Sequence, residues 1–152
     1  MPMKRHRSKN NVMVLDCAGR SRTIAVFLRR ALLKALEELR VRDADVSLAL
    51  ISDTRMRGLN RTYRRIDRTT DVLSFEQSAV IPSGRRLLGD ILISAPTARR
   101  QARQASRKIR EEFAELAVHG LLHLLGHDHA RRKETETMFA LQKKLLRKVI
   151  RP

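Results

Sequence analysis

The sequence predicts a single domain of the α+β class, with a small, mostly four-stranded sheet flanked by about five helices. Short apolar segments typical of strands are mixed with longer segments in which apolar residues recur every three or four positions, as in amphipathic helices. The two kinds of segment do not alternate in the regular repeat of a parallel α/β fold. The length of 152 residues is that of one domain.

Two strands and two helices are predicted in the first part of the chain. Residues 11–15 (NVMVL) fit a short edge strand, and residues 45–52 (DVSLALIS) fit a second strand. Ser52 or Asp53 then caps a helix of about ten residues. Residues 23–40 predict a helix whose apolar stripe consists of Ile24, Phe27, Leu28, Ala31, Leu32, Ala35 and Leu36.

Two further strands and three helices follow. Residues 71–75 (DVLSF) and 87–94 (LLGDILIS) predict strands joined by the turn-rich segment IPSGRR. Gly89, inside the second of them, indicates a bulge or a close approach of two backbones. Three helices are predicted. The first has Pro96 in its first turn, the second covers residues 111–125 and stops at Gly126, and the third covers residues 133–150.

The charge of the chain predicts a polyanionic partner. Lys and Arg number 33 against 16 acidic residues, which gives a formal net charge of +17. The basic residues cluster, and such clusters favour nucleic acid over a solvated basic surface that has no specific ligand. We expect residues 1–10 to form a basic tail and residues 11–152 to form the domain.

The single cysteine and the apolar segments predict the compartment. Cys17 has no partner for a disulfide and cannot build a thiolate zinc cluster, which fits a reducing compartment such as the cytoplasm. No apolar segment reaches the roughly 18 residues needed to span a membrane. We therefore expect a cytoplasmic protein that has no membrane partner.

Residues 119–129 (HGLLHLLGHDH) contain four of the five histidines and predict a metal site at the end of a central helix. His119 and His123 are four residues apart and therefore share one face of a helix. A turn at Gly126 would bring His129 to the same ion. Three protein ligands leave one position for water, as in catalytic zinc sites. One Zn²⁺ suits three imidazoles best, although Ni²⁺ or Co²⁺ also fits.

Two neighbouring residues leave alternatives open. His127 continues the four-residue spacing and could replace His129 as third ligand if the helix ran on. Asp128 could orient a ligand through a hydrogen bond, or it could be an ordinary turn residue. The spacing of the histidines also matches that of metzincin proteases, but Gly120 stands where those enzymes carry the glutamate base. This difference argues against an ordinary protease.

The histidine segment resembles the motif H-G-x-L-H-L-x-G-Y-D-H of the YbeY family, the bacterial endoribonucleases of ribosomal RNA maturation, and differs from it at His127. Residues 59–75 (LNRTYRRIDRTTDVLSF) and 87–94 resemble two further blocks of that family in the same order. The sequence departs from the family pattern at Thr69 and Glu76, where proline is usual.

This resemblance implies a small α+β fold and a zinc-dependent endoribonuclease directed at single strands, acting in ribosomal RNA maturation and ribosome quality control. It implies metal ligands at His119, His123 and His129. It also implies a functional arginine at Arg64, which would stabilise the negative charge of the transition state. The attacking group would be water or an RNA 2′-hydroxyl.

We expect the RNA to be held through its phosphates. The candidate contacts are Arg61, Arg65, Arg99, Arg100, Arg103 and Arg107. Aromatic residues are few, so reading of bases should be poor, and selectivity would come from the ribosome or a ribosomal protein. Two alternatives remain: a metalloprotease-like hydrolase, and a non-catalytic ribosome-associated RNA-binding factor with a structural metal.

Overall fold

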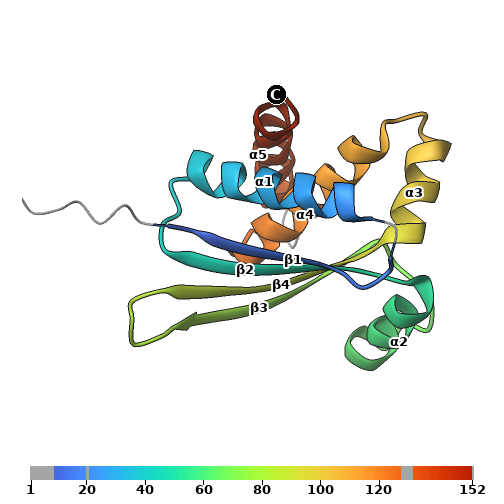
Figure 1. Ribbon diagram of the computed structural model, residues 1–152, viewed down its shortest axis with the longest axis horizontal. Helices are drawn as coiled ribbons and strands as arrows, with labels where there is room; N and C mark the ends of the chain where they lie inside the picture. The colour runs from blue at the N-terminus through green and yellow to red at the C-terminus, as the bar shows by residue number, and fades with distance from the viewer. Residues whose placement is uncertain (1–8, 20, 128–131, 152) are drawn as a thin grey trace, which may run out of the picture.

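A computed structural model describes residues 9–19, 21–127 and 132–151, and its four strands and five helices confirm the predicted α+β class (Figure 1). Residues 1–8 of the predicted basic tail lie outside the described part. The elements are β1 (Asn11–Asp16), α1 (Arg22–Glu38), β2 (Ala44–Ile51), α2 (Asp53–Arg64), β3 (Val72–Val80), β4 (Arg86–Ser94), α3 (Ala95–Gln104), α4 (Ile109–Leu124) and α5 (Arg132–Ile150).

The four strands form one mixed sheet in the order β1-β2-β4-β3. Strands β1, β2 and β4 are parallel, whereas β3 pairs antiparallel with β4 at the edge. A parallel pair needs a crossover connection, and α1 supplies it between β1 and β2. The carboxyl ends of the three parallel strands meet at one edge of the sheet, where α1, α2 and α3 begin (Figure 1).

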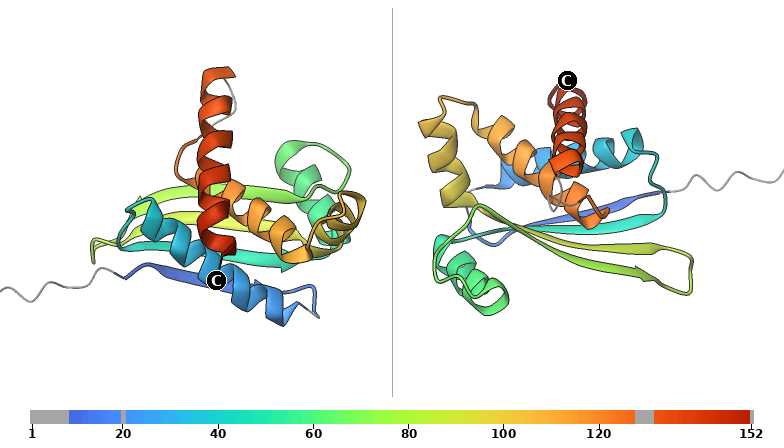
Figure 2. Two further views of the ribbon diagram at one scale, coloured as in Figure 1. Left: turned by 90° about the horizontal axis from the view of Figure 1, so that it is seen from above. Right: turned by 180° about the vertical axis from the view of Figure 1, so that it is seen from behind.

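The helices cover the two faces of the sheet unequally. Helices α1, α4 and α5 lie over one face, and α2 lies under one end of the other (Figures 1 and 2). Strand β2 shows the alternation that this arrangement requires, because Leu48 and Leu50 join the main core while Ala49 and Ile51 face α2. None of the described helices combines the length and the apolar character needed to cross a membrane.

A second, smaller core fixes α2. Met56 on this helix is buried against Ile51 and Leu73 of the sheet. At the other end of the helix, the rings of Tyr63 and Phe75 meet edge to face, with centroids 5.0 Å apart. The Ser52 hydroxyl accepts a hydrogen bond from the backbone N–H of Arg55, which confirms the predicted cap. These contacts hold both ends of α2 against the sheet.

The hairpin between β3 and β4 is longer than the sequence predicts. Strand β3 continues to Val80 rather than ending near residue 75, and an irregularity in its register follows Glu76. Of the added residues, Glu76, Ala79 and Val80 pair with the start of β4, and all three are exposed. Pairing to a neighbouring strand therefore extends β3 where the side chains give no alternating pattern.

Gly89 is the point at which β2, β3 and β4 are brought together. Its φ is +137°, and a Cβ built on it would lie 2.1 Å from the carbonyl oxygen of Phe75. The register between β2 and β4 shifts at the same point, between Asp45 and Val46. The structure thus confirms both a bulge and a close backbone approach.

We predict that Gly89→Ala lowers the free energy of unfolding by about 3 kcal/mol, because alanine meets both a strained φ and the backbone of β3. The matched control is Gly58→Ala in α2, where an added Cβ meets no atom within 4 Å. Helix propensity should make this control more stable by about 0.5–1 kcal/mol. Urea unfolding of both variants measures the difference, and equal stabilities would contradict the role of Gly89.

Candidate metal centre

Helix α4, which contains His119 and His123, runs through the middle of the fold. It packs on β3 and β4 on one side and on α1, α3 and α5 on the others. Most of its residues are buried, including Phe113, Ala117 and Leu121. His119 and His123 are only half-buried. They are therefore accessible polar side chains on a largely apolar helix.

Gly120 sets the distance between α4 and the sheet. A Cβ at this position would lie 2.8 Å from Cγ2 of Ile91 and 3.1 Å from Oγ of Ser74. The Ser74 hydroxyl donates a hydrogen bond of 3.3 Å to the carbonyl oxygen of Gly120. The position that holds glutamate in metzincins thus faces the packed sheet, where a longer side chain has no space. The structure supports the argument against an ordinary protease.

The rings of His119 and His123 lie edge to face, with centroids 4.6 Å apart and an interplanar angle of 67°. Their Nε2 atoms are 3.1 Å apart. Two imidazole nitrogens that bind one tetrahedral zinc at about 2.0–2.1 Å would be separated by about 3.3 Å. The helix therefore already holds the two nitrogens at close to the spacing that a shared metal ion requires.

Gln142 of α5 orients the first of these rings. Its amide oxygen lies 2.9 Å from Nδ1 of His119, and the residue is 5% exposed. An amide oxygen can only accept, so Nδ1 of His119 donates the hydrogen bond, and the neutral ring presents the lone pair of Nε2. This is the outer contact that metal-binding histidines usually make. Gln142 was not predicted from the sequence, although a polar residue on the inward side of α5 is a visible signal.

Helix α4 ends before His127, so this residue does not share the helical face of His119 and His123. The helix ends at Leu124, and Gly126 has a φ of +90°. The N–H of His127 donates to the carbonyl oxygen of Leu122, and the N–H of Gly126 donates to that of His123, each at 3.0 Å. These two bonds form a Schellman motif and confirm the predicted stop at Gly126.

Among the side chains that the structure describes, which include that of His127, no third metal-binding group joins the two histidines. The two residues predicted as third ligand and as its neighbour, His129 and Asp128, lie outside the described part of the chain.

Arg64 lies in the last turn of α2 and is exposed. Its neighbour Tyr63 packs on Phe75, whereas the adjacent strand residue Ser74 contacts α4. Because successive side chains of a strand point to opposite faces, α2 and the histidines lie on opposite sides of β3. Among the described residues, no hydrogen bond or ion pair joins Arg64 to either histidine.

The predicted RNA contacts fall into three groups. Arg61 and Arg65 lie beside Arg64 at the end of α2 and are exposed. The guanidinium group of Arg107 forms ion pairs with both Glu112 and Glu115, so its charge is largely used within the protein. The remaining group lies on α3 and consists of Arg99, Arg100 and Arg103.

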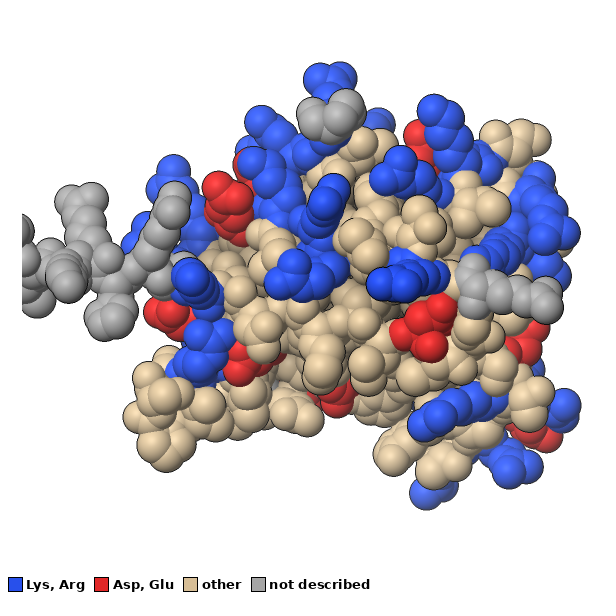
Figure 3. Space-filling view, in the orientation of Figure 1, with Lys and Arg blue, Asp and Glu red and all other residues tan. Residues whose placement is uncertain are grey.

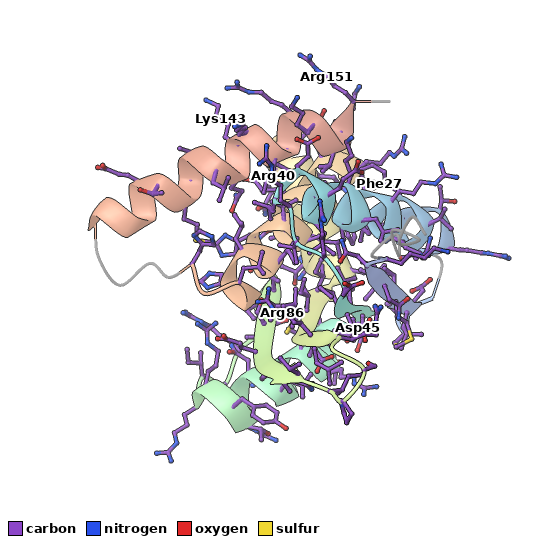
Figure 4. All side chains as sticks on the ribbon, turned by 90° about the vertical axis from the view of Figure 1, so that its left-hand side faces the viewer. Phe27, Arg40, Asp45, Arg86, Lys143 and Arg151 are labelled. Atoms are coloured by element: carbon purple, nitrogen blue, oxygen red, sulfur yellow. The ribbon has the colours of Figure 1, made fainter. Side chains whose placement is uncertain are left out.

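Basic side chains spread over the helical side of the molecule and over α3, while the outer part of the β3–β4 hairpin carries few charges on the face in view (Figure 3). Lys143 on α5 and Arg151 just after it point away from the body of the protein (Figure 4). The positive charge expected from the composition is therefore exposed to an approaching polyanion.

Asp53, the first residue of α2, ties this helix to α3. Its carboxylate accepts hydrogen bonds of 2.6 Å from both Ser94 and Thr97, and it forms an ion pair of 2.8 Å with Arg100. Partial burial raises the pKa of Asp53, but the hydrogen bonds from Ser94, Thr97 and Arg100 outweigh it and hold the pKa below its usual value. The charged form of Asp53 is therefore stabilised in the folded protein.

Residues 16–150 match the sequence profile of the family described as "Endoribonuclease YbeY". The chain belongs to the YbeY endoribonuclease family. Among its relatives, the Endoribonuclease YbeY of Sulfurihydrogenibium sp. is 38% identical over 148 residues, which cover 97% of both chains. That of Myxococcus xanthus is 41% identical over 141 residues, which cover 91% of this chain and 48% of the relative, so the chain spans about half of that protein.

A solved structure also resembles the fold of this YbeY-family chain. The solution structure of TM1509 from Thermotoga maritima has a TM-score of 0.67 and 28% sequence identity. The match covers 91% of this chain and 88% of the other. The family predicted from the three sequence blocks is thus confirmed.

We predict that Asp53→Asn lowers the free energy of unfolding at pH 7, because the amide keeps the acceptor oxygen but loses the charge that faces Arg100. A depressed pKa in the folded state stabilises the protein above the unfolded value, near 3.8, and this contribution is lost as the pH falls through the lower folded pKa. The difference between wild type and variant should therefore shrink below about pH 4.

Urea unfolding between pH 2.5 and 7 checks this pH dependence. The control is Asp67→Asn, which breaks a more exposed ion pair with Arg57 and should change stability less. A difference that does not depend on pH would contradict the role of the Asp53 charge.

Proposed function

We propose that this protein is a metal-dependent endoribonuclease that cleaves single-stranded segments of RNA, with ribosomal RNA as its substrate. The observation that carries the proposal is the pair of Nε2 atoms, 3.1 Å apart, on His119 and His123. Membership of a family of endoribonucleases and a net charge of +17 support RNA as the substrate. The single Cys17 is consistent with a cytoplasmic location.

The donor atoms fit zinc. His119 and His123 would hold the ion through Nε2, and the proposed third ligand is His129, as the family motif implies. A bound zinc ion supplies a Lewis acid that polarises a phosphoryl oxygen and lowers the pKa of water. Gln142 would keep the proton of His119 on Nδ1, so that Nε2 carries the lone pair that would bind a cation.

The proposed role of Arg64 is electrostatic. Negative charge builds on the phosphate during cleavage of a phosphodiester, and the guanidinium group of Arg64 would lower the energy of that state by reaching the phosphate around the edge strand β3. Arg64 forms no ion pair with a described acidic residue, so its charge is available to a substrate. Arg61 and Arg65, at the same end of α2, would bind neighbouring phosphates of the strand.

The contacts of the aromatic rings suggest how the protein would select its RNA. Tyr63 and Phe75, two of the few aromatic residues, pack on each other, and Phe27 lies under the guanidinium group of Arg110. Each of these rings has a partner within the protein, which limits stacking with bases, although Tyr63 is largely exposed. We therefore propose that the chain binds RNA through its backbone, and that the ribosome or a ribosomal protein presents the cleavage site.

We predict that the purified protein cleaves an RNA with an unpaired loop, and that a chelator or His119→Ala abolishes the cleavage. Arg64→Ala should lower kcat by about 100-fold or more, because it removes charge stabilisation of the transition state. Arg55→Ala removes the same charge from an exposed position of the same helix and should leave kcat unchanged. Gel analysis of labelled RNA measures each rate.

The outcomes separate the alternatives. Cleavage of an unstructured protein substrate but not of RNA would support the protease-like alternative and reject the proposal. Tight RNA binding without cleavage, unaffected by Arg64→Ala, would support the non-catalytic factor. Cleavage that survives both the chelator and His119→Ala would assign the activity to another site or to a contaminant.

A further inference from the structure

A hollow of about 350 Å³ lies at the carboxyl ends of the parallel strands. Its walls are Ala18 and Gly19 of the turn after β1, Ala95 and Pro96 at the start of α3, and three arginines of α3. Crevices at this edge of a parallel sheet are where α/β proteins commonly bind ligands. Neither α4 nor α5 contributes to the lining, so the hollow is distinct from the candidate metal centre.

Arg99 is a fixed cation in this hollow. Its Nη2 donates a hydrogen bond of 2.8 Å to the hydroxyl of Ser21, and its guanidinium carbon lies 5.8 Å from the ring centroid of Phe113. Both partners are neutral, so they hold the group in place without cancelling its charge. Arg99 is half-buried, which strengthens its attraction for an anion relative to a fully solvated side chain.

The other two arginines leave the hollow with an excess of positive charge. Arg100 forms an ion pair with Asp53, which offsets its charge. Arg103 is exposed, and its side chain forms no hydrogen bond or ion pair with any residue in the described part of the chain. Two of the three guanidinium groups are thus available to a ligand.

The start of α3 adds to this attraction. Ser94, at the N-cap position, makes no side-chain cap, because its hydroxyl donates to Asp53 instead. The first turn of α3 contains no acidic residue. The positive end of the helix dipole therefore faces the hollow, and the carboxylate of Asp53, which accepts hydrogen bonds from Ser94 and Thr97, offsets part of it.

We propose that this hollow is a phosphate-binding site. Guanidinium groups match phosphate oxygens in pairs, and the lining offers them alongside small residues, with no aromatic ring that would read a base. Resting on the proposed function, the phosphate belongs to the RNA strand, which this site anchors at a distance from the histidines. Phe113, which contacts Arg99, and His119 are six residues apart on α4, roughly 9 Å along the helix axis, so the anchor and the proposed cleavage centre would engage different nucleotides.

The first test uses inorganic phosphate and the intact protein labelled with ¹⁵N. At constant ionic strength, millimolar phosphate should shift the amide signals of Gly19 and of the first turn of α3 more than chloride does. Arg103→Gln should remove these shifts and should still fold, since Arg103 is exposed and supports no described contact. Arg147→Gln is the matched control, because it removes the same charge from an exposed position of α5. Shifts that are absent, or that both variants reduce equally, would overturn the site.

The second test identifies the source of the phosphate. Binding of a labelled single-stranded RNA is measured by fluorescence anisotropy in the His119→Ala background, so the result does not depend on cleavage. Arg103→Gln should weaken binding about tenfold and lower the salt dependence by about one phosphate contact, whereas Arg147→Gln should change it less than twofold. An acidic peptide that displaces phosphate from the hollow when RNA does not would overturn the assignment to RNA.

Discussion

The close packing of Gly120 on the sheet is the constraint on which the candidate centre depends. Because position 120 must face Ile91 and Ser74, the rotation of α4 is fixed, and His119 is directed toward α5. His123 lies one turn later on the same face of α4, and its ring packs against that of His119. A larger residue at position 120 would push the helix away from the sheet and separate His119 from Gln142. The spacing of the two Nε2 atoms is thus a consequence of helix-to-sheet packing, not only of the sequence interval.

The contact between α4 and α5 explains how the largely apolar helix α4 can hold two half-buried histidines. Burying an imidazole without a partner is costly, and the amide of Gln142 offsets this cost at His119. The helix then ends in a Schellman motif that turns the chain away after His123. The candidate centre therefore lies where α4 ends in a turn. Gln142 of α5 fixes the ring of His119, and the ring of His119 packs against that of His123.

The sequence predicted the features that depend on local chemistry. The glycines at positions 89 and 126 marked the bulge and the helix stop, and the interval between His119 and His123 marked their common face. It did not predict the features that depend on contacts between distant segments. Gln142 is 23 residues from His119, and only the packing of α5 on α4 brings them together. The extension of β3 depends likewise on pairing with β4 rather than on its own residues.

A centre built on His119 and His123 is tested by competition for zinc between a chromophoric chelator and three proteins: the wild type, His119→Ala and His127→Ala. We expect one tightly bound zinc per chain in the wild type and in His127→Ala, because His127 has left the helical face. We expect His119→Ala to lose the ion. Unchanged zinc affinity in His119→Ala, or loss of zinc in His127→Ala, would contradict a centre built on the two histidines of α4.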